Sequence, residues 1–326
     1  MKALIVESAG GPFRLIDRPR PRPGEQEVLV RVAASGVNPL DTKIRAGAAG
    51  HARHPLPAIL GLDLAGYVEA MGDGVDRFRP GDEVYGMTGG VGGLPGSLAE
   101  YAVVDADLLA RKPANLSMRR AAALPLVAIT AWEGLVDRAK IRAGQTVLVQ
   151  GGAGGVGHLA IQIARAFGAD VFATHRGAHA ALLESLGATA INNQAQSVES
   201  YTAEYTGGRG FDLVYDTVGG EQLDASFAAV GKFGHVVSCL GWGVHALAPL
   251  SFKAATYSGV FTLLPLLSGE GRARHGAILA DVARLVEAGQ VVPRVDDRIF
   301  DLASAADAHD AVSSGGAQGK VVVSVS

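Results

Sequence analysis

The glycines at residues 151–157 are the part of the sequence best suited to chemistry. A short apolar run leads into Gly-Gly-Ala-Gly-Gly-Val-Gly, in which Gly152, Gly154 and Gly157 match the pattern G-x-G-x-x-G. Apolar residues then recur at helical spacing over residues 156–167. A strand, a glycine turn and a helix in this order predict a dinucleotide site, because glycine lets the backbone approach the pyrophosphate and the helix N-terminus offers free N–H groups. The alternative is an ordinary glycine-rich turn.

The end of the next strand distinguishes the two nicotinamide cofactors. In NAD-specific folds an acidic residue stands there, about 20 residues beyond the glycines, and binds the ribose 2′-OH. Here the strand is expected at residues 171–174 and is followed by His175 and Arg176, whereas Asp170 precedes it. A guanidinium matches the geometry of a phosphate. The sequence therefore predicts NADPH, unless Arg176 is only a solvated loop residue.

Composition limits the classes of protein to consider. The 326 residues have room for about two domains, and the formal net charge of −3 gives no reason to expect nucleic-acid or membrane-surface binding. The single cysteine, Cys239, excludes an internal disulfide and a four-cysteine zinc site. The apolar run at residues 3–6 is too short for a signal peptide or a membrane span. We therefore expect a cytoplasmic protein.

Two patterns of secondary structure divide the chain. The N-terminal third predicts strands and loops, and from about residue 121 strands alternate with helices, which is typical of a doubly wound parallel sheet. A last strand of that sheet is expected at residues 256–264. We predict an α/β protein with a β-rich domain, residues 1–122 and 265–326, split around a nucleotide-binding domain, residues 123–264.

A basic, proline-rich run occupies residues 18–24. Such a run is either a stiff connector between strands or an exposed ligand for a proline-binding domain. We favour the connector.

Several short motifs together resemble the quinone oxidoreductase (zeta-crystallin-like) branch of the medium-chain dehydrogenase/reductase superfamily. They include S-G-V-N-P-L-D at residues 35–41, G-L-D-L-A-G at 61–66, G-D-E-V-Y-G at 81–86, A-E-Y at 99–101, Y-D-T-V-G at 215–219 and G-K-V at 319–321, beside the glycine turn. The resemblance covers nearly the whole chain. It implies a GroES-like catalytic domain made from both ends of the chain, a Rossmann domain between them, and a homodimer or homotetramer.

The resemblance also indicates whether the chain has the ligands of a catalytic metal. Zinc-dependent relatives bind the catalytic metal through a cysteine, where this chain has Asn38, and through the histidine of a G-H-E motif, where it has Leu62. An amide and an alkyl group do not form a tetrahedral zinc site. We interpret His51 and His54 as loop residues. Catalysis is therefore expected to be metal-free.

The same resemblance implies the residues of the site. Asn38 and Asp41 would line the catalytic cleft, Lys43 and Tyr85 are candidate proton donors, and Thr130 would lie near the nicotinamide. The other residues expected to bind the cofactor are Gly152, Ala153, Gly154, Gly155, Val156, Gly157, Thr174, His175, Arg176, Asn193, Thr217, Val218, Cys239, Leu240, Gly241, Phe261, Leu263 and Lys320. Structural alternatives stay open, because Asp41 could cap a helix and Thr130 could bond its own helix backbone.

Three positions depart from the family pattern in two ways. Lys43 stands where the family often has a tyrosine, and His179 and Asn193 replace a lysine and a tyrosine that commonly help hold the 2′-phosphate. The phosphate clamp is therefore incomplete, and Arg176 with His175 must supply most of it.

The activity implied by the resemblance is hydride transfer from NADPH to a small electrophile. With a quinone, the enzyme needs to supply little more than orientation and a dry cleft. Reduction of an enone or alkenal double bond is the alternative, and it also needs a proton donor. A third hypothesis is a non-catalytic NADPH-binding structural or RNA-contacting protein. The acidic charge balance and the absence of a basic stripe argue against contact with RNA.

Overall fold

Three sheets, divided between two structural units, organise the part of the chain that the structure describes. The computed structural model describes residues 1–325. Unit 1 contains residues 1–129, 263–289 and 293 onward, and unit 2 contains residues 130–262 and 290–292. Both units combine helices with strands, which confirms the predicted α/β class.

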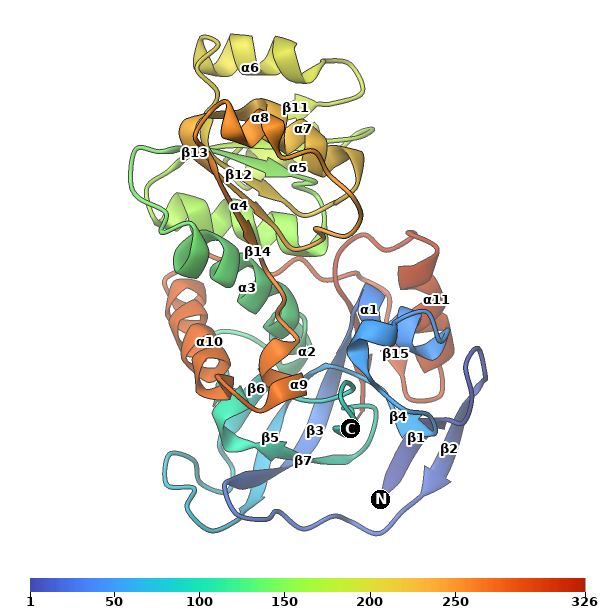
Figure 1. Ribbon diagram of the computed structural model, residues 1–326. Helices are drawn as coiled ribbons and strands as arrows, with labels where there is room; N and C mark the ends of the chain where they lie inside the picture. The colour runs from blue at the N-terminus through green and yellow to red at the C-terminus, as the bar shows by residue number, and fades with distance from the viewer. Residues whose placement is uncertain (326) are drawn as a thin grey trace. The chain divides into compact units, whose positions relative to one another are not determined.

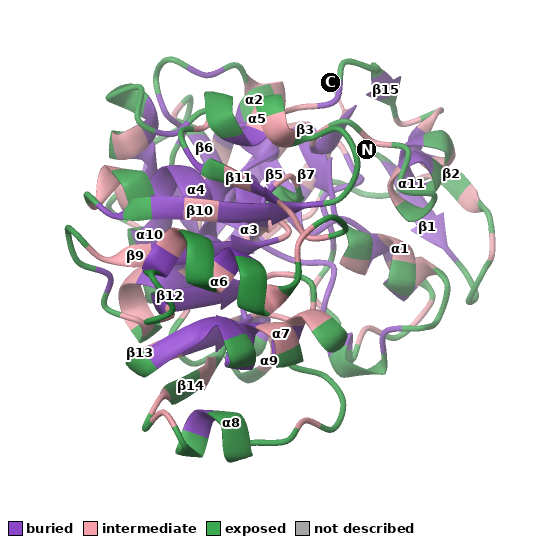
Figure 2. Cartoon of the chain, turned by 90° about the horizontal axis from the view of Figure 1, so that it is seen from above, coloured by how far each residue is buried: buried purple, intermediate pink, exposed green. Residues whose placement is uncertain are grey.

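Unit 2 is built on six strands, each parallel to its neighbours. In order across the sheet they are β11 (Thr189–Asn192), β10 (Asp170–His175), β9 (Thr146–Gln150), β12 (Phe211–Asp216), β13 (Val230–Ser238) and β14 (Thr256–Gly259). The central strands are buried along almost their whole length (Figure 2), as expected of a parallel sheet covered by helices.

The helices of unit 2 alternate with its strands along the chain (Figure 1), as the sequence pattern predicts. They are α4 (Gly155–Ala166), α5 (Ala180–Ser185), α6 (Val198–Thr206), α7 (Glu221–Ala229) and α8 (Ala248–Ser251), preceded by the π-helix η3 (Glu133–Arg138). The helix α3 (Pro125–Trp132) begins in unit 1 and ends in unit 2.

Unit 1 contains a three-stranded and a seven-stranded sheet. The first has the order β2 (Phe13–Asp17), β1 (Lys2–Val6), β4 (Ala58–Ile59). The second has the order β15 (Phe300–Asp301), β16 (Val321–Ser324), β3 (Glu27–Val37), β5 (Asp63–Met71), β6 (Glu83–Met87), β8 (Leu109–Arg111), with β7 (Tyr101–Asp105) also paired to β3. Because Val321 of β16 pairs with Val37 of β3, the two ends of the chain share one sheet.

The helices of unit 1 pack around these sheets. They are α1 (Pro39–Arg45), α2 (Met118–Ala122), α9 (Leu264–Ser268), α10 (Arg272–Glu287) and α11 (Ala305–Ser313), with the short 3₁₀ turns η1 (Gly50–Ala52) and η2 (Ala106–Leu108). Among residues 1–325, no helix has both the length and the apolarity needed to cross a bilayer.

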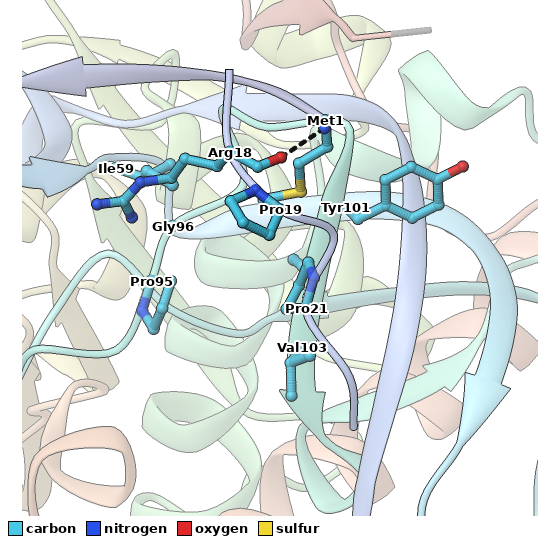
Figure 3. A pocket seen from close by; sticks show the side chains of 10 residues that line it. Met1, Arg18, Pro19, Pro21, Ile59, Pro95, Gly96, Tyr101 and Val103 are labelled. Carbon is cyan, nitrogen blue, oxygen red and sulfur yellow. Dashed lines mark hydrogen bonds between the residues drawn. The ribbon is translucent and has the colours of Figure 1, made fainter. Parts of the chain in front are cut away.

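The proline-rich run at residues 18–24 belongs to unit 1 and has no helix or strand structure of its own. Its Arg20 side chain stacks 4.2 Å from the ring centroid of Tyr101 and makes a 2.8 Å ion pair with Glu69. Between the run and the sheet a small cavity of about 300 Å³ is lined mainly by apolar atoms (Figure 3). These contacts agree with a connector that is held along its length.

Candidate functional site

The turn between β9 and α4 depends on its glycines. Gly151 has φ +74°, where glycine is unstrained. A Cβ added to Gly157 would lie 2.3 Å from the carbonyl oxygen of Gly151, and one added to Gly152 would lie 2.7 Å from a side chain of β10. Gly154 and Gly155 remain exposed at the start of α4. This cradle, with the N–H groups of the first helical turn, fits a pyrophosphate.

Two predicted cofactor residues hold the turn in place. The Thr174 hydroxyl donates to Gln150 Oε1 at 2.7 Å and accepts the N–H of Gly151 at 3.1 Å. The Thr174 carbonyl accepts the N–H of Gly152 at 3.0 Å. From the next strand, Thr217 Oγ1 donates to the Gln150 carbonyl at 2.7 Å. Thr174 and Thr217 therefore stabilise the turn through hydrogen bonds to Gln150 and to the glycine backbone.

The ends of β10 and β11 bring together the residues predicted to recognise a 2′-phosphate. Arg176 is exposed, and its guanidinium has no hydrogen-bond or ion-pair partner among residues 1–325. His175 is buried, with Nδ1 3.1 Å from the Gly177 carbonyl oxygen. The N–H of Asn193 donates to the His175 carbonyl at 3.2 Å. His179, exposed before α5, is the other member of this group.

Beyond β12, a buried carboxylate orders the loop that carries several predicted contacts. Asp216 accepts the N–H groups of Val218 and Gly219, each at 3.0 Å, and the Ser238 hydroxyl at 2.7 Å. Sequence reasoning did not single out Asp216, although it lies inside the Y-D-T-V-G motif. Burial raises the pKa of the neighbouring Cys239 thiol to about 12, so this thiol is not a nucleophile at neutral pH.

Thr130 belongs to a hydroxyl pair in unit 2. Its Oγ1 lies 3.0 Å from that of Thr262, and its carbonyl accepts the Tyr215 hydroxyl at 2.6 Å. The other predicted cofactor residues differ in exposure: Val218 and Gly241 are exposed, Leu240 and Phe261 are partly buried, and Leu263, which belongs to unit 1, is buried.

Unit 1 contains a buried polar cluster at the end of β3. Lys320, just before β16, donates from Nζ to Asn38 Oδ1 and, at 3.2 Å, to the Val37 carbonyl. Asn38 Nδ2 donates to Asp63 Oδ2 at 2.9 Å, and this oxygen is 3.9 Å from the Lys320 ammonium. The Asn38 N–H donates to Asp41 Oδ2 at 2.8 Å. The predicted pair Asn38 and Asp41 thus lies in one network with Lys320.

The electrostatics of the cluster favour a bound proton. Burial, reinforced by the charge of Asp63, raises the pKa of Asp41 to about 7. Burial raises the pKa of Asp63 to about 6, although the Lys320 ammonium opposes the shift, and burial lowers the pKa of Lys320. The Oδ1 atom of Asp41 is buried and has no hydrogen-bond partner in the described part of the chain. The charge of the Lys320 ammonium therefore acts on two carboxyl groups, those of Asp41 and Asp63.

The two candidate proton donors make no hydrogen bond to this cluster. Tyr85 is fully buried, and its hydroxyl donates to the Leu279 carbonyl at 2.6 Å. Burial also raises the pKa of Tyr85. Lys43 is exposed on α1. Their catalytic role stays a prediction, and in this structure the Tyr85 proton already has an acceptor.

A catalytic zinc does not fit the residues present. Leu62 is buried and offers no ligand atom, and the Lys320 ammonium already binds Asn38 Oδ1. Within residues 1–325, no group of three His, Cys, Asp or Glu side chains is placed to hold a metal ion.

Comparisons with known proteins agree with this architecture. A family model described as "Alcohol dehydrogenase GroES-like domain" matches residues 24–114, and one described as "Zinc-binding dehydrogenase" matches residues 186–323. The chain is 36% identical over 307 residues to "NADPH-dependent alkenal/one oxidoreductase, chloroplastic" of Arabidopsis thaliana, covering 92% of this chain and 72% of that protein.

Two further relatives match almost end to end. The chain is 30% identical over 331 residues to "Quinone oxidoreductase" of Homo sapiens, covering 99% of this chain and 97% of that protein. It is 59% identical to a solved "alcohol dehydrogenase superfamily protein from Novosphingobium aromaticivorans", with a TM-score of 0.98 and full coverage of both chains.

Proposed function

Since the chain belongs to the medium-chain dehydrogenase/reductase superfamily, among the zinc-free quinone oxidoreductases and alkenal reductases, we propose that it is an NADPH-dependent, metal-independent reductase of quinones. The observation that carries the proposal is the glycine cradle of unit 2, followed one strand later by the exposed Arg176, which has no partner within residues 1–325. We also propose, from the resemblance, a homodimer or homotetramer and, from the composition, a cytoplasmic location.

NADPH would supply the hydride, and this chain's residues would bind and orient it. The first turn of α4 would hold the pyrophosphate, where Gly154 and Gly155 leave the backbone open. Arg176 would hold the 2′-phosphate through guanidinium donors. The hydroxyl pair of Thr130 and Thr262 would face the nicotinamide end.

The choice of a quinone rests on the state of the candidate acids. A quinone accepts hydride into a ring that becomes aromatic, and water can protonate the product later. An enone needs its developing enolate stabilised and protonated, for which a donor is worth about 10²–10⁴-fold in rate. The Tyr85 hydroxyl already donates to Leu279, and Lys43 is an exposed surface residue, so neither is a prepared donor.

Enone or alkenal reduction is the second candidate. It is favoured by the similarity to the alkenal/one oxidoreductase, which is higher in identity than that to the quinone oxidoreductase of Homo sapiens. In that case the proton has to come from solvent or from a group such as Asp41, whose pKa of about 7 leaves it partly protonated at neutral pH.

A panel of acceptors separates these functions. NADPH oxidation is measured with benzoquinone, a naphthoquinone, a short alkenal and a cyclic enone, using the parent protein, Tyr85→Phe and Lys43→Met. We expect the highest kcat/KM with a quinone and nearly unchanged values in both variants. An enone with the highest kcat/KM, and its selective loss in one variant, would establish the double-bond reductase. NADPH binding without reduction of any acceptor would favour a non-catalytic protein.

A further inference from the structure

We propose that Gln194 is a positioning residue for NADPH recognition. Its side chain holds the Gly177 peptide and so fixes the backbone that presents Arg176, although Gln194 itself does not touch the phosphate. This inference rests on the proposed preference for NADPH, and it adds a residue that neither the glycine turn nor the charge pattern identifies.

Side chains hold both peptide groups of Gly177. Its N–H donates to Gln194 Oε1 at 3.1 Å, and its carbonyl oxygen lies 3.1 Å from His175 Nδ1. With φ +64°, Gly177 adopts a left-handed conformation that glycine tolerates without strain. Arg176 therefore lies in the sequence between the last residue of β10 and a glycine whose backbone is held by two side chains.

The backbone of Gln194 is itself held by a hydrogen bond, so its side chain reaches Gly177 from a fixed position. Its N–H donates to Asn192 Oδ1 at 3.0 Å. Asn192 ends β11 and pairs with His175 of β10 in the parallel sheet. The next residue, Asn193, donates its N–H to the His175 carbonyl. The loops after two neighbouring strands are thus cross-linked by one side chain, across 17 positions of sequence.

This cross-link should strengthen binding of the 2′-phosphate of NADPH and have little effect on binding of the 2′-hydroxyl of NADH. Arg176 has no partner among residues 1–325, so protein contacts fix its backbone and leave the guanidinium free. A long, mobile side chain binds an anion well only when its backbone starts from the correct place, because ordering costs free energy. Loss of the Gln194 contact would therefore weaken the binding of NADPH, which has a 2′-phosphate. The binding of NADH, which has none, would change little.

His175 takes a new role in this arrangement. Sequence reasoning assigned its ring to the phosphate, yet Nδ1 is used for the Gly177 carbonyl and the residue is buried. As the donor in that contact, Nδ1 has to carry the ring proton. We therefore assign His175 to the same positioning task as Gln194, on the opposite side of the Gly177 peptide.

The test uses Gln194→Met, which keeps the length of the side chain and removes the acceptor. Gln196→Met is the matched control, because Gln196 lies in the same loop but bonds Glu204, at 2.8 Å, rather than Gly177. Dissociation constants are measured by calorimetry for NADPH, NADH, 2′,5′-ADP and 5′-AMP. We expect Gln194→Met to raise the dissociation constants of NADPH and 2′,5′-ADP by about five-fold, as for the loss of one hydrogen bond. The dissociation constants of NADH and 5′-AMP, and the melting temperature, should stay close to those of the control.

A double-mutant cycle with Arg176→Ala shows whether Gln194 acts through Arg176. In the Arg176→Ala background, Gln194→Met should cause no further loss of NADPH affinity. An unchanged ratio of NADPH to NADH affinity in Gln194→Met, or an equal loss in both backgrounds, would overturn the inference while leaving the proposed function intact. Equal affinity of the parent protein for NADPH and NADH would overturn both.

Discussion

At the scale of single residues, Asp41 gives the clearest prediction, because its burial makes folding stability depend on pH. The pKa of Asp41 is raised from 3.8 to about 7 in the fold, beside the ammonium of Lys320 and the carboxyl of Asp63. The folded state therefore keeps a proton that the unfolded state releases. The contribution of Asp41 is fully present below pH 3.8 and is lost as pH rises through about 7.

Replacing Asp41 with Asn should remove this loss. The free energy of unfolding of the parent protein should fall relative to Asp41→Asn by on the order of 1 kcal/mol per pH unit between about pH 4 and 7. Asp63, with its pKa raised to about 6, shifts both proteins in the same direction. Urea unfolding at several pH values measures the difference. Parallel pH profiles for the two proteins would show that Asp41 is ionised throughout.

The sequence predicted several site residues but not their partners. Asn38 and Asp41 were found by resemblance, and the structure places them in one network. Lys320 was expected at the cofactor, yet its ammonium bonds Asn38, 282 positions away in the chain. Tyr85 likewise finds its acceptor 194 positions away, at Leu279. Such pairings join residues that are far apart in the sequence, and a local pattern contains no information about them.

At the scale of elements, the turn between β9 and α4 contains glycines with two different tasks. A Cβ on Gly157 would meet the Gly151 carbonyl oxygen at 2.3 Å, which forces the backbone to move. A Cβ on Gly154 would lie 3.3 Å from the same oxygen, at an exposed position. Gly157 is therefore needed for packing, and we propose that Gly154 allows the close approach of a phosphate.

Alanine substitutions should separate these tasks. We expect Gly157→Ala to lower the free energy of unfolding by roughly 1–3 kcal/mol, as for overpacking of a tight site. Gly154→Ala should keep most of its stability but bind NADPH more weakly. Urea unfolding and NADPH titration of both variants provide the measurement. Wild-type stability in Gly157→Ala would contradict the packing role.

The sequence located most elements of unit 2, and the differences have structural causes. The strand expected at residues 256–264 ends at Gly259 as β14. Its neighbour β13 ends at Ser238, which pairs with Gly259, so no partner strand continues beyond that point. The π-helix at Glu133–Arg138 was not expected. A Cβ on Gly134 would lie 2.5 Å from the Tyr215 ring, a packing relation that the helical pattern does not reveal.

At the scale of the whole molecule, the predicted organisation rested on the change of pattern along the chain. The predicted boundaries, at residues 122 and 264, can be compared with the division into units after residues 129 and 262. At the N-terminal boundary the difference lies in α3, which runs through residue 129 without a break. A continuous helix gives no local signal for the point at which one unit ends.

For the whole protein, we propose hydride transfer from NADPH to a quinone without a metal. Its most direct test is NADPH oxidation by chelator-treated protein, under single-turnover conditions with a naphthoquinone, with metal content checked by elemental analysis. We expect metal-free protein to oxidise bound NADPH completely, and only when the quinone is added. Loss of turnover on chelation that stoichiometric zinc restores, or NADPH that stays reduced in the presence of the quinone, would contradict it.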